Sequence, residues 1–88
     1  MPRNVIFKPN AFDDYNYWAV TDKKIFERLV MLIIDTQRSP FSGIGKPEPL
    51  KGALQGYWSR RITDEHRLVY KVTDNDIIIT ACRYHYSK

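Results

Sequence analysis

Hydrophobic and polar positions change their period along this chain of 88 residues. Between residues 10 and 37, apolar side chains recur every three or four positions, which is typical of amphipathic helices. Beyond residue 56 they alternate with polar side chains, which is typical of half-buried strands. The pattern predicts an α+β fold.

A short strand at Val5-Ile6-Phe7 is followed by a first helix over roughly residues 10–19. Asn10 is its expected N-cap, because an amide oxygen there can accept a bond from an unpaired N–H of the first turn. The helical period places three apolar residues on one face, namely Phe12, Tyr15 and Ala19.

A second helix is expected from Thr21-Asp22 to about Gln37. Ser39-Pro40 ends it, because the residue before a proline disfavours the helical region. We expect this helix to lie on the sheet, since its apolar stripe is wide and holds Ile25, Phe26, Leu29, Val30, Leu32, Ile33 and Ile34.

Three strands are predicted after a long loop at residues 41–56. They cover residues 57–63, 67–73 and 76–83. The expected fold is therefore β-α-α followed by a three- to four-stranded antiparallel meander, with the helices packed on one sheet face. We expect a single domain over residues 1–88.

Composition adds a basic second half. The net charge is +4, with six basic and five acidic residues in 1–44 but eight and five in 45–88. This excess fits either a polyanion partner or ordinary solubilising charge. Cys82 is the only cysteine and is expected to be buried, so no disulfide is predicted. We find neither a signal peptide nor a bilayer-spanning run, and expect a cytoplasmic protein.

The first candidate for chemistry is the segment Lys46-Pro47-Glu48-Pro49-Leu50-Lys51. Its prolines argue against a central strand and confine Glu48 to extended backbone angles. Glu48 is either a solvated surface charge or a preorganised general base between Lys46 and Lys51.

The second candidate is a cluster of arginines on predicted strands. Arg60 and Arg61 are adjacent, so one of the two shares a sheet face with Arg67. Two guanidinium groups on one face would bind phosphate, or they would be solvated and paired with the acidic turn. Tyr57, Trp58 and Tyr70 are expected to pack in the sheet or core, and His66 is expected to be a turn residue.

The third candidate is the chain end, Arg83-Tyr84-His85-Tyr86. It carries a cation, an imidazole and two phenols, which suits either a packed strand end or one half of an RNA-cleaving site. The two histidines, the one cysteine and the carboxylates have no metal-ligand spacing, so neither a metal nor another cofactor is expected.

Taken together, four sequence blocks resemble the RelE/YoeB toxin superfamily. These are residues 45–51, 56–63, 65–70 and 81–86, and the resemblance covers essentially the whole chain. It implies a compact microbial-ribonuclease fold and a ribosome-dependent, metal-independent mRNA endoribonuclease. It also implies a YefM-like antitoxin partner and a tendency to form homodimers. The chain departs from the pattern only by continuing past Tyr86 with Ser87-Lys88.

The resemblance also implies residue roles. Glu48 matches the general base and His85 the general acid, and Arg67 and Lys51 match residues that stabilise the phosphate. Tyr86 matches a tyrosine at the scissile site. Flanking RNA-binding positions are expected at Lys46, Arg60, Arg61, Arg83 and Tyr84.

Strand parity sets a condition on this assignment. If Asp74-Asn75 is a two-residue turn, Arg67 lies opposite Cys82, and His85 falls on the other side of the sheet. For the two side chains to meet, the strand must bulge or bend near Arg83–Tyr84, or the turn must be one residue longer. Two other functions stay open, a non-catalytic RNA- or ribosome-binding module and a gyrase-inhibiting toxin on the same scaffold.

Overall fold

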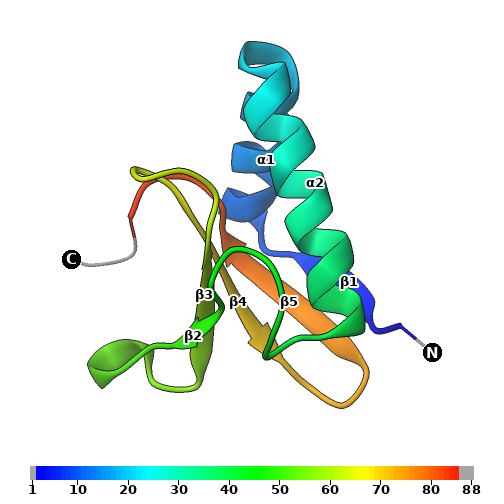
Figure 1. The fold of residues 1–88 in the computed structure, drawn as a ribbon, viewed down its shortest axis with the longest axis vertical. Helices are drawn as coiled ribbons and strands as arrows, with labels where there is room; N and C mark the ends of the chain where they lie inside the picture. Colours follow the sequence, from blue (N-terminus) through cyan, green and yellow to red (C-terminus); the bar gives the residue numbers. More distant parts are fainter. Residues whose placement is uncertain (1, 86–88) are drawn as a thin grey trace.

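The computed structural model describes residues 2–85, so Tyr86 of the predicted site lies outside the described residues. The chain begins with a strand and two helices, continues through a long loop, and finishes with the strands of a meander (Figure 1). The elements are β1 (Asn4–Phe7), α1 (Pro9–Thr21), α2 (Lys23–Arg38), β2 (Glu48–Pro49), the 3-10 turn η1 (Gly52–Leu54), β3 (Tyr57–Arg61), β4 (Arg67–Val72) and β5 (Asp76–Ala81).

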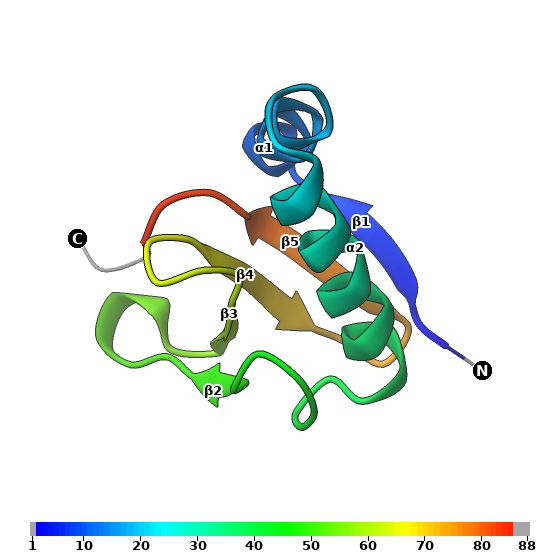
Figure 2. The same ribbon diagram turned by 45° about the horizontal axis from the view of Figure 1, so that its top comes forward.

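The five strands form one mixed sheet in the order β1-β5-β4-β3-β2. Strands β2 to β5 pair antiparallel in sequence order, which confirms the predicted meander, and β1 adds to its edge in parallel with β5. Both helices lie on one side of this sheet (Figure 2). The α+β prediction is therefore confirmed.

The core lies between the helices and the sheet. Its buried apolar residues come from both helices, from the turn after β3, from the central strands and from the start of the tail: Ala11, Trp18, Leu29, Leu32, Ile33, Ile62, Leu68, Tyr70, Ile77, Ile79 and Cys82. The alternation predicted beyond residue 56 is seen in β4, where Leu68 and Tyr70 are fully buried on the helix side. No helix among residues 2–85 is long and apolar enough to cross a membrane.

The start of α1 differs from the prediction. The helix begins at Pro9 and Lys8 is the N-cap, because proline is already suited to the first helical position. Asn10 instead lies inside the helix, and its Nδ2 donates to the carbonyl oxygen of Thr80, 2.7 Å away. The interaction ties α1 to β5.

The buried face of α1 is also shifted. Ala11 and Trp18 are buried, whereas Phe12 is 53% exposed and Ala19 is exposed. Ala11 with Trp18 and Phe12 with Ala19 have the same spacing along a helix, so the helical period alone did not show which pair is buried. The indole of Trp18 decides the orientation, because its Nε1 donates to the carbonyl oxygen of Cys82 inside the core.

Helix α2 agrees more closely with its prediction. The Asp22 carboxylate caps it by accepting a bond from the Ile25 N–H, and it ends at Arg38, just before Ser39-Pro40. Most of the predicted stripe faces the core, but Ile34 is 44% exposed.

Candidate active site

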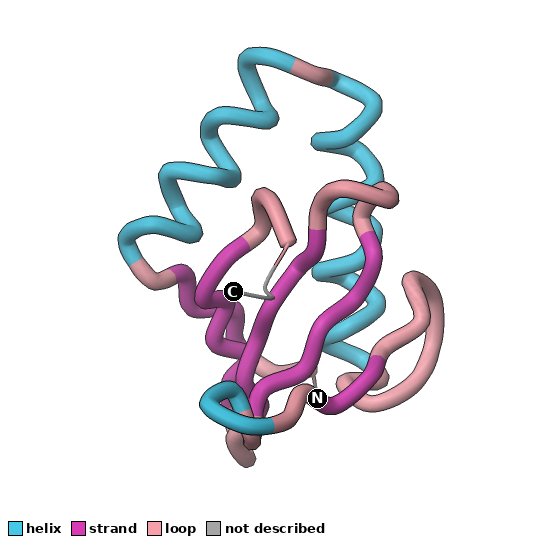
Figure 3. Tube along the Cα trace, turned by 90° about the vertical axis from the view of Figure 1, so that its left-hand side faces the viewer, coloured by secondary structure: helices cyan, strands magenta, loops and turns pink. Residues whose placement is uncertain are grey.

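Sheet register gathers the candidate residues on the face away from the helices. Glu48 pairs with Ser59, Ser59 with Val69, and Val69 with Ala81, so these four residues form one row across the sheet. Residues directly opposite each other share a face. We call this side the open face, and Figure 3 looks onto it, with α2 passing behind the strands and α1 beside them.

Glu48 lies at the edge of the open face. Strand β2 has only two residues and pairs on one side, with β3, which confirms that Pro-Glu-Pro is not a central strand. The N–H of Leu50 continues the pairing by donating to the Tyr57 carbonyl oxygen at 2.9 Å. Glu48 itself is exposed and is held on a backbone that its flanking prolines restrict.

Arg67 lies on the same face, in the next row. It pairs with Arg61, two residues along β3 from Ser59, the partner of Glu48. Strands lie about 4.8 Å apart and rise ~3.4 Å per residue, so the Cα atoms of Glu48 and Arg67 are roughly 12 Å apart.

The guanidinium of Arg67 is oriented by the turn between β3 and β4. Its Nη1 donates to the carbonyl oxygens of Thr63, Asp64 and His66 at 2.6, 3.1 and 3.1 Å. Because the backbone is fixed in a strand and the side chain is bonded to a turn, the charged guanidinium group has little freedom to move.

The remaining basic candidates surround Glu48. Lys46 and Lys51 are exposed on either side of β2. The carbonyl oxygen of Gly45 accepts a 2.7 Å bond from the Arg61 N–H, so the loop carrying Lys46 lies against β3. The Arg61 side chain is 46% exposed, with its Nη1 3.7 Å from Asp64. All three side chains are cationic and exposed, and their RNA-binding role stays a prediction.

Arg60 does not have the exposed position that was predicted for it, because its side chain has no exposed surface. Arg61 shares the open face with Arg67, so Arg60 points to the helix side, where Tyr70 and Leu68 lie. The predicted RNA-binding role of Arg60 is therefore wrong. An exposed role belongs to Arg61 alone of this adjacent pair.

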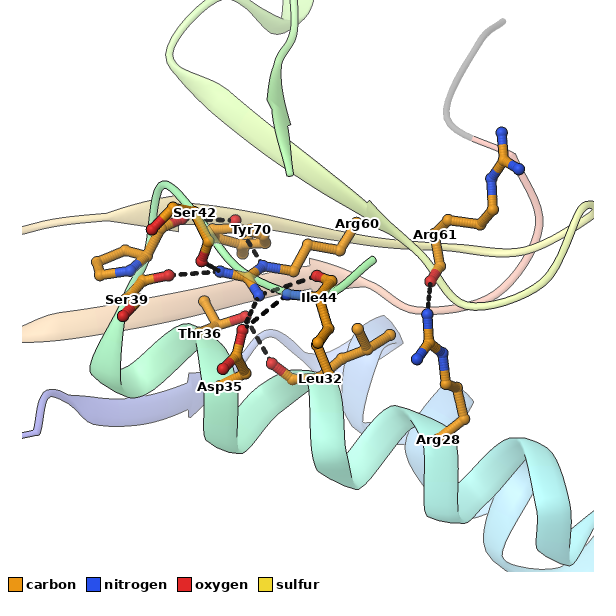
Figure 4. A network of polar contacts seen from close by, with 11 residues as sticks. Arg28, Leu32, Asp35, Thr36, Ser39, Ser42, Ile44, Arg60, Arg61 and Tyr70 are labelled. Atoms are coloured by element: carbon orange, nitrogen blue, oxygen red, sulfur yellow. Dashed lines mark hydrogen bonds and ion pairs between the residues drawn. The ribbon is translucent and has the colours of Figure 1, made fainter. Parts of the chain in front are cut away.

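The Arg60 guanidinium joins three parts of the fold (Figure 4). It pairs with the Asp35 carboxylate of α2 at 2.6 Å and donates from Nε to the Tyr70 hydroxyl at 3.1 Å. It also donates to three loop carbonyl oxygens, those of Ser39, Ser42 and Ile44. The arginine thus fixes the loop that leads into β2 and Glu48.

The chain end meets the parity condition. Val72, Lys71 and Tyr70 pair with Ile77, Ile78 and Ile79, as a two-residue turn at Asp74-Asn75 requires. The next pair is Val69 with Ala81, so Thr80 is an extra residue in a β-bulge. The bulge reverses the parity of everything after it.

A turn follows the bulge. Tyr84 has a positive φ of 64°, which non-glycine residues adopt uncommonly. Its carbonyl oxygen accepts a 3.0 Å bond from the Arg67 N–H, so the tail passes directly beside the start of β4. The predicted change of backbone direction before His85 is confirmed.

His85 lies at a small cavity of about 180 Å³. Val69 and Ala81 of the open-face row contribute to its walls, as does Leu54 of η1. The described part of the tail is therefore beside the row that begins with Glu48.

Arg83 and Tyr84 have packing roles in this structure. The Arg83 guanidinium lies over the ring of Tyr17 on α1, 3.5 Å from its centroid, and 4.7 Å from the centroid of the Tyr84 ring. Tyr84 is 55% exposed. Arg83 is half-buried between two rings, so it holds the tail against α1.

Cys82 anchors the start of the tail. Its N–H donates to the Asp14 carboxylate at 3.1 Å, and its thiol lies 3.5 Å from the Ala11 carbonyl oxygen. Burial raises the pKa of this thiol to about 12, and the Asp14 charge adds to the rise. Burial also raises the pKa of Asp14, although the Cys82 N–H opposes that rise. The cysteine is buried as predicted.

Sequence reasoning missed the role of His66. The imidazole is only 8% exposed, and its Nδ1 accepts a 2.7 Å bond from the Tyr84 N–H. Its position in an Asp-Glu-His turn suggested an ordinary turn residue. The sequence around His66 gave no sign that its ring would accept a hydrogen bond from a residue 18 positions away. No cluster of three or more potential metal-ligating side chains occurs among residues 2–85.

Comparison with known proteins identifies the family. Residues 7–86 match the family described as the YoeB-like toxin of bacterial type II toxin–antitoxin systems. The chain belongs to the YoeB-like toxins. It is 60% identical to Toxin YoeB of Escherichia coli K12 over 82 residues, which cover 93% of this chain and 98% of the relative.

Solved structures support the same family assignment. A YoeB/ParE toxin from Agrobacterium tumefaciens superposes with a TM-score of 0.91 at 46% identity, covering 94% of this chain and 99% of that one. A YoeB dimer from Staphylococcus aureus has a TM-score of 0.90 at 49% identity, covering 98% of this chain and all of the other. The heterotetrameric YoeB–YefM complex of the same organism has a TM-score of 0.88 at 49% identity, with the same coverage. The described fold is therefore that of this toxin family.

Proposed function

We propose that this YoeB-like toxin is a ribosome-dependent, metal-independent mRNA endoribonuclease that inhibits translation. The observation that carries the proposal is the placement of Glu48, Arg67 and the tail around one sheet face. The bulge at Thr80 and the turn at Tyr84 are what bring the chain end to that face.

The reaction needs one proton acceptor and one proton donor. The Glu48 carboxylate removes the proton of the 2′-hydroxyl beside the scissile phosphate, and the oxygen attacks phosphorus. His85, protonated at that moment, gives its proton to the departing 5′-oxygen. The products are a 2′,3′-cyclic phosphate, or a 3′-phosphate after hydrolysis, and a 5′-hydroxyl.

Positive charge stabilises the transition state. Arg67 is oriented by three turn carbonyls, and Lys51 is three residues from the base, so both meet charge on the phosphoryl oxygens. Lys46 and Arg61 contact flanking RNA. The family resemblance assigns Tyr86 to the scissile site, and this residue lies outside the described part of the chain.

The partners follow from the relatives. The Staphylococcus aureus YoeB is described as a dimer and in complex with YefM. We propose that this chain forms a homodimer, is held inactive by a YefM-like antitoxin, and acts in the cytoplasm on ribosome-bound mRNA.

Two substitutions test the reaction. Glu48→Gln and His85→Gln keep size and hydrogen-bonding ability but remove proton transfer, so each should abolish cleavage of mRNA on translating ribosomes while binding persists. Cellular mRNA 5′ ends within translated codons should appear with the wild type and vanish with either variant. An mRNA carrying a 2′-deoxy sugar at the cut site should stay intact.

The alternative functions give different results. A non-catalytic binding module loses little in either variant, and a gyrase inhibitor acts on a target other than mRNA and has no need of Glu48 or His85. Cleavage of the 2′-deoxy substrate would overturn the proposed mechanism.

A further inference from the structure

His66 is a buried imidazole that the proposed reaction does not use. It immediately precedes β4, and its ring packs edge-on against the Trp18 indole, with centroids 4.7 Å apart. Its Nε2 lies 3.7 Å from the Glu65 carboxylate. The ring is thus held in one orientation from two sides.

The hydrogen bond to Tyr84 defines the protonation of this ring. A backbone N–H can only donate, so Nδ1 of His66 must carry the lone pair that accepts it. The neutral ring therefore has its proton on Nε2, the side facing Glu65. A proton on Nδ1 would place two donors against each other and break the contact with Tyr84.

Tyr84 is the residue that turns the chain before His85. Its N–H is bonded to the His66 ring and its carbonyl oxygen to the Arg67 N–H, at 2.7 and 3.0 Å. Both backbone polar groups of Tyr84 are thus held by two consecutive residues, one just before β4 and one at its start. These bonds offset the strain of a positive φ at a non-glycine residue.

We propose that neutral His66 is a positioning residue that holds the Tyr84 turn and thereby places His85 at the open face. The inference rests on the proposed function for its kinetic consequence, but the hydrogen bond and the tautomer are independent of it. His66 acts through the backbone and touches no reacting atom.

Charged groups lie on both sides of this contact. The Glu65 carboxylate faces Nε2, and the Arg83 guanidinium lies on the adjoining Tyr84 ring.

The test compares two substitutions. In His66→Asn the amide oxygen takes the place of Nδ1 as acceptor, whereas His66→Leu has similar bulk and no acceptor. On translating ribosomes, His66→Leu should lower kcat roughly 10- to 100-fold with KM little changed, the size expected when a reacting group is misplaced by about 1 Å. His66→Asn should restore kcat to within a few-fold of the wild type.

Two further readouts report on the contact itself. In the wild type, nitrogen NMR of the imidazole should find the proton on Nε2, and the Tyr84 amide should exchange slowly. Exchange of that amide should quicken in His66→Leu and remain slow in His66→Asn.

The outcomes separate the two proposals. Full kcat in His66→Leu, an Nδ1–H tautomer in the neutral wild type, or loss of kcat in His66→Asn would each overturn the positioning role. If His66→Leu does not fold, the wild-type tautomer and His66→Asn decide the matter. Cleavage that survives His85→Gln instead refutes the proposed reaction and leaves the bond between His66 and Tyr84 standing.

Discussion

Replacing Arg60 by methionine should cost this protein much of its stability. The guanidinium makes five hydrogen bonds, one of them within the ion pair with Asp35, and has no exposed surface. Methionine keeps most of the aliphatic stem but removes the arginine donor from three loop carbonyl oxygens and from the Asp35 carboxylate, which keeps its bond from the Ile44 N–H. The loop from Ser39 to Ile44 then loses its attachment to β3.

The magnitude follows from these contacts. Breaking a buried ion pair by removing one partner costs about 3–5 kcal/mol. The Asp35 side chain is 31% exposed and can recover some hydration, so we expect a loss near the lower end, ~3 kcal/mol. A domain of this kind is stable by only about 5–15 kcal/mol in total.

Arg61→Met is the matched control. It is the next residue on the same strand, its side chain is 46% exposed, and its ion pair with Asp64 is 3.7 Å long. An exposed pair contributes ~0–1 kcal/mol, so this variant should unfold at nearly the wild-type urea concentration. Urea unfolding followed by tryptophan fluorescence measures both. Free energies of unfolding for the two variants within ~1 kcal/mol of each other would refute the anchoring role of Arg60.

Three further predictions concern the same interior. Arg60 lowers the pKa of the Asp35 carboxyl, so the pair stabilises the fold above the ordinary pKa and ceases to do so as pH falls through the lowered one. Asp35→Asn should therefore be less stable than the wild type at pH 7. The difference in their free energies of unfolding, measured with urea, should become smaller in acid. Gly43→Ala should lower the melting temperature more than Gly52→Ala, because both have positive φ but only the first would place a Cβ 2.1 Å from the Asp35 carboxylate. Cys82, with its raised pKa and full burial, should react with a thiol reagent only on unfolding, and rapid labelling of the native protein would contradict this.

Much of the fold was predictable from local pattern. The stripe on α2 and the alternation on β4 carry a period that survives in the folded chain, and prolines restrict their neighbours wherever they occur. The face of α1 was not predictable, because Ala11 with Trp18 and Phe12 with Ala19 have the same spacing. A long-range bond from the Trp18 indole to Cys82 chose between them.

Some features of the candidate site were likewise predictable from the sequence, and others were decided by the tertiary structure. Sequence alone indicated Glu48 on a stiff edge segment, one of two adjacent arginines beside Arg67, and a backbone turn before His85. Tertiary structure decided that Arg61 faces outward while Arg60 is buried, because side chains alternate with a period of two and only packing against the helices shows which set is inside.

The bulge and the His66 contact were likewise decided by the folded chain. An extra residue at Thr80 has no local sequence signature, and it lies where the β4–β5 register shifts, just before the tail bonds to α1. The His66 bond to Tyr84 joins positions 18 residues apart, which only the β4–β5 pairing brings together. The sequence thus determined the elements and the chemical groups this protein carries. Strand register and long-range hydrogen bonds, which depend on the whole packed sheet, determined which of those groups meet.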